Sequence, residues 1–169
     1  FHQKLRAPLL TCPKLGCINI HPSLLPRYRG RHPLNWVLVN GETETGLTIH
    51  YMDEGFDTGD IISQLRVPID EGDTARTLQD KFVKLCPSLV VQTVSQLADG
   101  SAIRTPQDPA IASYYPVRTK ADGVIHWDAS ARSIYNLVRA ITRPYPGAWT
   151  PFRGGQLIVW WSEVIPGGS

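Results

Sequence analysis

The chain has 169 residues, 42% hydrophobic and 19% charged, so it can bury one compact core and a small appended unit. Its net charge is +2, and the densest basic stretch is only Arg27, Arg29 and Arg31, which argues against the basic stripe of a nucleic-acid-binding protein. The three cysteines argue against a disulfide framework, and no apolar run approaches the ~20 residues of a transmembrane helix, so we expect a cytoplasmic protein.

The first predicted strand is the apolar run LGCINI at 15–20, which is typical of a strand buried on both faces in a parallel sheet. A loop with two prolines and a glycine follows at 21–31. Residues 33–39 then predict a helix that begins at a proline and ends before Asn40-Gly41.

Two further strands are predicted at 46–52 and 61–69. The segment DEGFDTGD at 53–60 separates them and is too acidic and glycine-rich to be a strand. We therefore expect a loop held between two regular elements, which is a common place for functional residues.

A long helix is predicted at 73–98 from the spacing of its apolar residues, with Asp73 or Thr74 as the N-cap. Pro87 should kink it, because proline removes one backbone hydrogen bond of a helix interior.

The remaining chain is predicted to contain a connector at 104–126, broken by prolines and glycine. A helix at 130–141, capped by Ser130, comes next. A turn at 142–150 and a strand at 156–164 complete the pattern. The order of strands and helices predicts an α/β fold, of which residues 1–100 supply only part of a doubly wound sheet.

Three polar residues suggest chemistry on this scaffold. Asn19 and His21 are two residues apart on or beside a strand, so their side chains point to the same face, and Asp57 lies in the loop at 53–60. Imidazole is a general base near pH 7, a carboxylate raises its pKa and orients it, and an amide donates to an oxyanion. These types suit acyl transfer without a covalent intermediate, although a lone Asn-x-His on a strand is more often a satisfied core pair than a site.

Other residues give weaker signals. Cys12, Cys17 and His21 lack a fourth zinc ligand nearby, and His50 lies within a predicted strand, where we expect a structural role. Trp127 and Trp149 are expected to be packing anchors, with stacking on a base or sugar as the alternative.

Two stretches carry a family resemblance. GCINIHPSLLPRYRG at 16–30 and ETGLTIHYMDEGFDTGDII at 44–62 resemble the formyltransferases that use 10-formyltetrahydrofolate. The family pattern is an Asn-x-His strand, an SLLP loop and an Asp-Thr-Gly or Asp-x-Gly loop. The match covers most of residues 15–70 and resumes at 114–150.

This resemblance implies a Rossmann-like catalytic domain with 10-formyltetrahydrofolate as co-substrate and no metal. It implies that His21 accepts and donates the proton, that Asn19 stabilises the tetrahedral oxyanion, and that Asp57 raises the pKa of His21 and orients it. The residues that it assigns to the folate pocket are Ser23, Leu24, Leu25, Pro26, Arg31, Asp53, Glu54, Gly55 and Phe56.

The acceptor is indicated by the continuation at 122–150, which resembles both methionyl-tRNA formyltransferases and sugar-nucleotide N-formyltransferases. The forms YRGRHPLNW and HYMDEGFDTGD, together with the weak basic character, favour the sugar branch. We therefore expect a UDP- or dTDP-linked amino sugar as acceptor and no membrane partner. The alternatives are methionyl-tRNA, which would be the one nucleic-acid partner, and a non-catalytic fragment that retains the motif.

Family members begin with further strand–helix units, which at roughly 30 residues each implies that the N-terminal half of the domain is absent here. We expect residues 1–105 to be the C-terminal portion of the catalytic domain, 106–126 a linker, and 127–169 the start of a C-terminal subdomain. A half-sheet exposes an unpaired edge, so a homo-oligomer is a further expectation.

Overall fold

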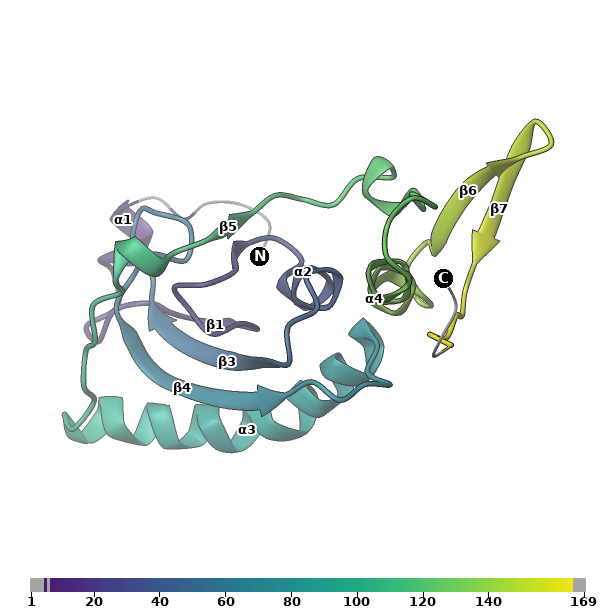
Figure 1. Cartoon of the computed structure of the whole chain (residues 1–169). Helices are drawn as coiled ribbons and strands as arrows, with labels where there is room; N and C mark the ends of the chain where they lie inside the picture. Colours follow the sequence, from purple (N-terminus) through teal and green to yellow (C-terminus); the bar gives the residue numbers. More distant parts are fainter. Residues whose placement is uncertain (1–4, 6, 166–169) are drawn as a thin grey trace.

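A three-stranded sheet forms the centre of the computed structural model, which describes residue 5 and residues 7–165. Its strand order is β1-β3-β4, with β1 at Ile18–His21, β3 at Glu44–Tyr51 and β4 at Ile61–Pro68. The chain is thus of mixed α/β class (Figure 1).

The direction of β1 differs from the sequence prediction. β1 pairs antiparallel with β3, as β3 does with β4, and Ile20 on β1 is 39% exposed. A short apolar run is compatible with either direction of pairing, and only the partner strand decides between them.

The longest helix packs against this sheet, and two shorter helices pack against each other. α3 (Ala75–Asp99) runs along β4 and β3, while α2 (Pro33–Val39) and α4 (Ala131–Ile141) lie side by side (Figure 1). The predicted cap of α3 is Thr74, whose hydroxyl accepts the Thr77 backbone N–H. α3 continues through Pro87 to Asp99, so the proline does not end the helix.

The C-terminal part is a helix followed by a hairpin. Ser130 caps α4 as predicted, since its hydroxyl accepts the Ser133 N–H. β6 (Ala148–Phe152) and β7 (Gly155–Val159) pair antiparallel, so β6 begins inside the predicted turn and β7 is shorter than the predicted strand.

The predicted connector at 104–126 is tied to the N-terminal part of the chain. Within it, β5 (Tyr114–Tyr115) pairs with β2 (Arg29–Gly30), and the Tyr115 ring stacks on the Tyr28 ring with 4.7 Å between centroids. The prolines hid this short strand, whose partner lies more than 80 residues earlier in the chain. The remaining short elements are α1 (Ala7–Leu10), η1 (Pro109–Ile111) and η2 (Ala121–Gly123).

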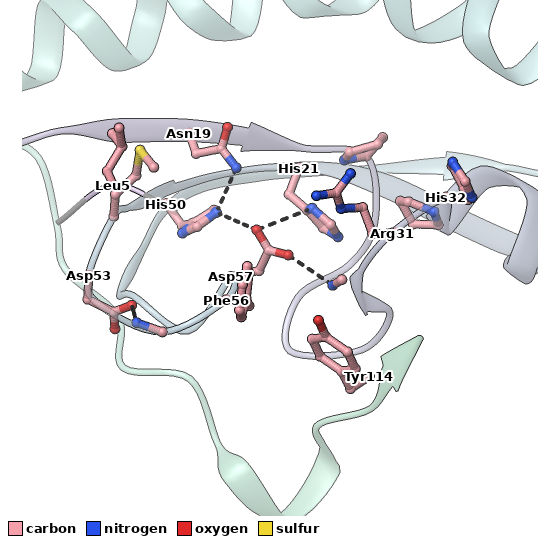
Figure 2. Close-up of a pocket in the computed structure, with 15 residues that line it drawn as sticks. Leu5, Asn19, His21, Arg31, His32, His50, Asp53, Phe56, Asp57 and Tyr114 are labelled. Atoms are coloured by element: carbon pink, nitrogen blue, oxygen red, sulfur yellow. Dashed lines mark hydrogen bonds and ion pairs between the residues drawn. The ribbon is translucent and has the colours of Figure 1, made fainter. Parts of the chain in front are cut away.

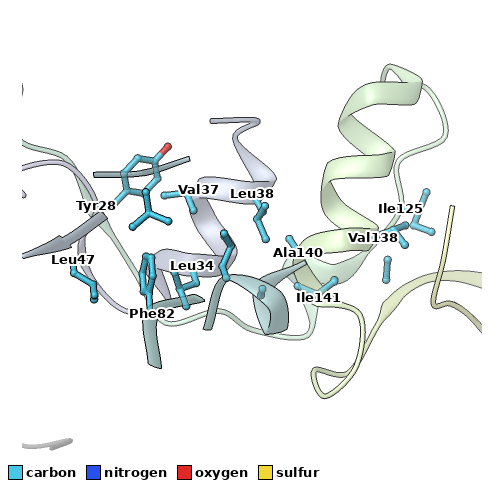
Figure 3. Close-up of a cluster of buried hydrophobic side chains, with 14 residues drawn as sticks. Tyr28, Leu34, Val37, Leu38, Leu47, Phe82, Ile125, Val138, Ala140 and Ile141 are labelled. Carbon is cyan, nitrogen blue, oxygen red and sulfur yellow. The ribbon is translucent and has the colours of Figure 1, made fainter. Parts of the chain in front are cut away.

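The hydrophobic core joins the sheet, the three helices and the hairpin (Figure 3). Leu38 of α2, Leu78 of α3 and Ala140 of α4 are fully buried in it. The core therefore fixes α2, and with it the loop that precedes α2, against the sheet. No helix in the described part of the chain is long and apolar enough to cross a membrane.

Candidate active site

The register of β1 and β3 assembles a polar cluster. Asn19 lies directly opposite His50, and His21 opposite Thr48, so Asn19, His21 and His50 share one face of the sheet. The loop after β3 brings Asp57 over that face, and Figure 2 shows its carboxylate between the two imidazoles.

His21 is 4% exposed, and each of its ring nitrogens faces an oxygen. Its Nε2 lies 2.7 Å from the Tyr28 carbonyl oxygen, which can only accept, so Nε2 carries a proton. Its Nδ1 faces Asp57 Oδ1 at 3.6 Å, beyond hydrogen-bond length. In the neutral ring, Nδ1 therefore has a free lone pair that can take a proton from a substrate.

The pKa of His21 is lowered, because burial outweighs the raising effects of the Asp57 charge and of the Tyr28 carbonyl. From the sequence, Asp57 is expected to raise the pKa of His21. That contribution is present, but desolvation of the imidazolium is larger. His21 is therefore neutral at pH 7, as a general base must be.

Hydrogen bonds from neighbouring residues fix both the carboxylate and the backbone of Asp57. Its Oδ2 accepts the Gly30 N–H at 2.9 Å, and the side chain of Gln107 donates to the backbone carbonyls of Asp57 and Gly59. Its backbone has a φ of 57°, a region that aspartate tolerates better than most residues. Burial raises its pKa, but the neighbouring His50 and His21 side chains and the Gly30 N–H together lower it, so the carboxylate is ionised.

His50 belongs to this cluster, although the sequence suggested only a structural role. It is 2% exposed, and its Nδ1 donates to the Tyr51 carbonyl at 2.7 Å. Its Nε2 lies 3.4 Å from Asn19 Nδ2 and 3.6 Å from Asp57 Oδ1. The sequence did not indicate that His50 belongs to the site, because a histidine is common in an alternating strand. Its proximity to Asn19 depends on the register between β1 and β3.

A cavity of about 340 Å³ opens over the cluster (Figure 2). Its lining includes these residues predicted from the sequence: Asn19, His21, Arg31, Asp53, Gly55, Phe56 and Asp57. The residues that the sequence reasoning missed are Leu5, Pro22, Gly30, His32, Pro33, His50, Met52 and Tyr114. Tyr114 was missed because it lies on β5, inside the supposed connector.

The structure does not bring Glu54 or the segment from Ser23 to Pro26 into the lining of this cavity. Ser23 is fully buried and donates to the Arg27 carbonyl, and Leu25 is 3% exposed. The Leu25 N–H donates to Thr48 Oγ1, which in turn donates to the Ser23 carbonyl. These bonds fix Ser23 and Leu25, and with them the turn after β1.

A second cavity, of about 510 Å³, shares His32 with the first and lies between α2, the 118–123 segment and the C-terminal hairpin. Arg118, Lys120 and Trp149 line it. The Arg118 Nη1 is buried and makes no hydrogen bond within the described residues, and the Lys120 ammonium lies 5.3 Å from the Trp149 ring centroid.

The first cavity thus combines a neutral imidazole, an ionised carboxylate and an amide donor. This set can remove a proton from a nucleophile and stabilise an oxyanion at a carbonyl. Among the described residues, no three His, Cys, Asp or Glu side chains are grouped so that they could hold a metal ion.

Comparisons with known proteins agree with this chemistry. The family profile described as "Formyl transferase" matches residues 1–94, and the profile described as "Formyl transferase, C-terminal domain" matches residues 118–169. The methionyl-tRNA formyltransferase of Pelotomaculum thermopropionicum is 48% identical over 157 residues, which are 93% of this chain and 50% of that protein. The chain therefore spans about half the length of this curated relative.

Two solved structures show the same fold. A 4-N formyltransferase from Francisella tularensis is 26% identical, with a TM-score of 0.81 over 96% of this chain and 69% of that one. An N-formyltransferase from Helicobacter canadensis, in complex with folinic acid and dTDP-3-aminofucose, is 27% identical, with a TM-score of 0.73 over 81% of this chain and 51% of that one.

Proposed function

Because the chain belongs to the formyl transferase family, we propose that it transfers a formyl group from 10-formyltetrahydrofolate to a primary amine. The observation that carries this proposal is the convergence of Asn19, His21 and Asp57 in one cavity, within the segment that matches the family profile. The folinic acid bound by the Helicobacter canadensis relative supports a folate donor.

In the proposed reaction the amine nitrogen attacks the formyl carbon, and a new C–N bond forms as the carbonyl electrons move to oxygen. The Asn19 amide donates to that oxyanion. His21 Nδ1 removes a proton from the attacking amine, and the charge of Asp57, 3.6 Å away, stabilises the imidazolium. Collapse of the tetrahedral intermediate breaks the bond between the formyl carbon and N10 of the folate, and His21 returns the proton to N10.

For the folate we propose contacts from four predicted residues that line the cavity: Arg31, Asp53, Gly55 and Phe56. Asp53 Oδ1 accepts the Gly55 N–H and the Thr58 hydroxyl, which fixes the loop that carries Phe56. Folate contact by residues 23–26, which the sequence also predicts, stays a prediction, because these residues lie outside the lining of the cavity.

The acceptor that we favour is methionyl-tRNA, with a nucleotide-linked amino sugar as the second candidate. Identity of 48% over nearly the whole chain supports the first, whereas the Helicobacter canadensis enzyme in complex with dTDP-3-aminofucose is 27% identical. This reverses the preference drawn from the sequence, where the weak basic character favoured a sugar.

Both acceptors carry phosphate, and the second cavity suits a phosphate-bearing acceptor. Arg118 and Lys120 line it with positive charge, and His32 lines both cavities. We therefore expect Arg118→Gln to raise KM for the acceptor at least 10-fold while KM for the formyl donor stays constant.

The test is formyl transfer by the full chain, with 10-formyltetrahydrofolate as donor and either charged initiator tRNA or a panel of dTDP- and UDP-amino sugars as acceptor. His21→Ala is the control. Formylation of the tRNA by wild type and not by His21→Ala supports the proposal. Formylation of a sugar alone selects the second acceptor, and equal transfer by wild type and variant overturns the catalytic assignment.

A further inference from the structure

We propose that His50 is a positioning residue that fixes which side of the Asn19 amide faces the reacting carbonyl. This inference rests on the proposed formyl transfer, in which the NH₂ group of Asn19 must face the oxyanion. Figure 2 shows the two side chains joined across β1 and β3, with Asp57 below them.

The tautomer of neutral His50 is set by its contact with the Tyr51 carbonyl. Nδ1 lies 2.7 Å from the Tyr51 carbonyl oxygen, which cannot donate, so the proton of the neutral ring is on Nδ1. Nε2 then carries a lone pair and acts only as an acceptor. The ring cannot turn to exchange its nitrogens without losing the Tyr51 bond in a site that is 2% exposed.

The Asn19 amide has two orientations, which have the same shape but opposite hydrogen bonding. In the observed orientation, Nδ2 donates to His50 Nε2 at 3.4 Å and keeps a second N–H for a ligand. A flipped amide would place its oxygen against that lone pair. Such a contact between two acceptors is costly where water is excluded.

Asp57 strengthens this choice. Its Oδ1 lies 3.6 Å from His50 Nε2 and 3.6 Å from His21 Nδ1, while its Oδ2 is occupied by the Gly30 N–H. His50 Nε2 thus already has one acceptor oxygen nearby, and a flipped Asn19 would add its amide oxygen as another beside Nε2. The acceptors around His50 therefore favour the orientation in which Asn19 directs one N–H toward Nε2. In the same orientation the second N–H of the amide can donate to the oxyanion.

The experiment compares His50→Leu, which removes the acceptor, with His50→Gln, whose side-chain oxygen can take the place of Nε2. The matched control is His126→Leu, at an exposed histidine outside both cavities. We expect kcat to fall about 10-fold in His50→Leu, less than the 10²–10³-fold of losing an oxyanion donor. His50→Gln should retain at least a third of wild-type kcat, and KM for the formyl donor should not change in either variant.

A purely structural role predicts a different pattern, in which activity follows the melting temperature. Equal loss of kcat in His50→Gln and His50→Leu, or a loss fully explained by unfolding at the assay temperature, would overturn the proposal.

A spectroscopic measurement separates this inference from the proposed function. In chain labelled with ¹⁵N histidine and asparagine, neutral His50 should show a protonated Nδ1 and an unprotonated Nε2. The Asn19 NH₂ resonances should move in His50→Leu and return toward wild type in His50→Gln. A protonated Nε2 in neutral His50 refutes the positioning role even if transfer is active, whereas absence of transfer with the expected spectra refutes only the function.

Discussion

Replacement of Asp57 by asparagine tests the proposed catalytic cluster most directly. The side chain keeps its shape, and an asparagine oxygen can still accept the Gly30 N–H, so the loop should stay in place. What is lost is one negative charge 3.6 Å from His21 Nδ1, between side chains that are 6% and 15% exposed. At an effective dielectric of about 20, Coulomb's law gives about 4.6 kcal/mol for that charge acting on the imidazolium.

If all of that energy were lost from the transition state, the rate would fall by about 2,000-fold, which is the upper limit of the effect. We expect kcat of Asp57→Asn to fall by about 10²–10³, because relaxation and water entry recover part of the loss. The pH dependence has a definite sign. The Asp57 charge raises the pKa of His21, so its removal lowers that pKa further. The acid limb of kcat/KM should therefore move to lower pH while the plateau falls.

The assay is steady-state formyl transfer from about pH 5 to 8, with circular dichroism to check folding. Asp60→Asn is the matched control, because Asp60 lies at the end of the same loop and pairs with Arg104 outside the first cavity. A plateau within 3-fold of wild type, or an acid limb that moves to higher pH, would refute the role of Asp57.

Three further predictions concern the same region. Asn19→Ala should lower kcat by about 10²–10³ with little change in melting temperature, and an unchanged kcat would exclude Asn19 as the oxyanion donor. Gly59→Ala should destabilise the chain by about 1–3 kcal/mol in urea unfolding, since a Cβ there would meet the Tyr51 carbonyl oxygen at 1.9 Å. Gly72→Ala, where an added Cβ would have no atom within 4 Å, should leave the free energy of unfolding unchanged. Equal destabilisation by Gly59→Ala and Gly72→Ala would contradict the predicted clash at Gly59. Because the pKa of His21 is lowered in the folded chain, stability should be constant above about pH 6.5 and fall below it, and a rise on acidification would contradict its burial as a neutral group.

Much of the local structure could be predicted from the sequence. The caps Thr74 and Ser130 lie where the hydroxyl residues precede apolar helical spacing, and helices follow both. The spacing of Asn19 and His21 placed them on one face, because strand side chains alternate. The loop composition at 53–60 marked the segment that carries Asp57.

The sequence could not supply contacts that depend on distant pairing. Whether His50 faces Asn19 is decided by the register of β1 and β3, and a shift of one residue would turn it to the other face. Tyr114 reaches the first cavity only because β5 pairs with β2, far earlier in the chain. The second cavity exists only where α2, the 118–123 segment and the hairpin meet.

The chemical groups of the site are thus determined by the sequence, and their protonation and orientation by the tertiary structure. The charge of Asp57 alone would raise the pKa of His21, as its presence in the sequence suggests. Burial of the ring outweighs that charge, because desolvation of a cation depends on everything packed around it. The same packing sets the tautomer of His50 and, through it, the direction of the Asn19 amide.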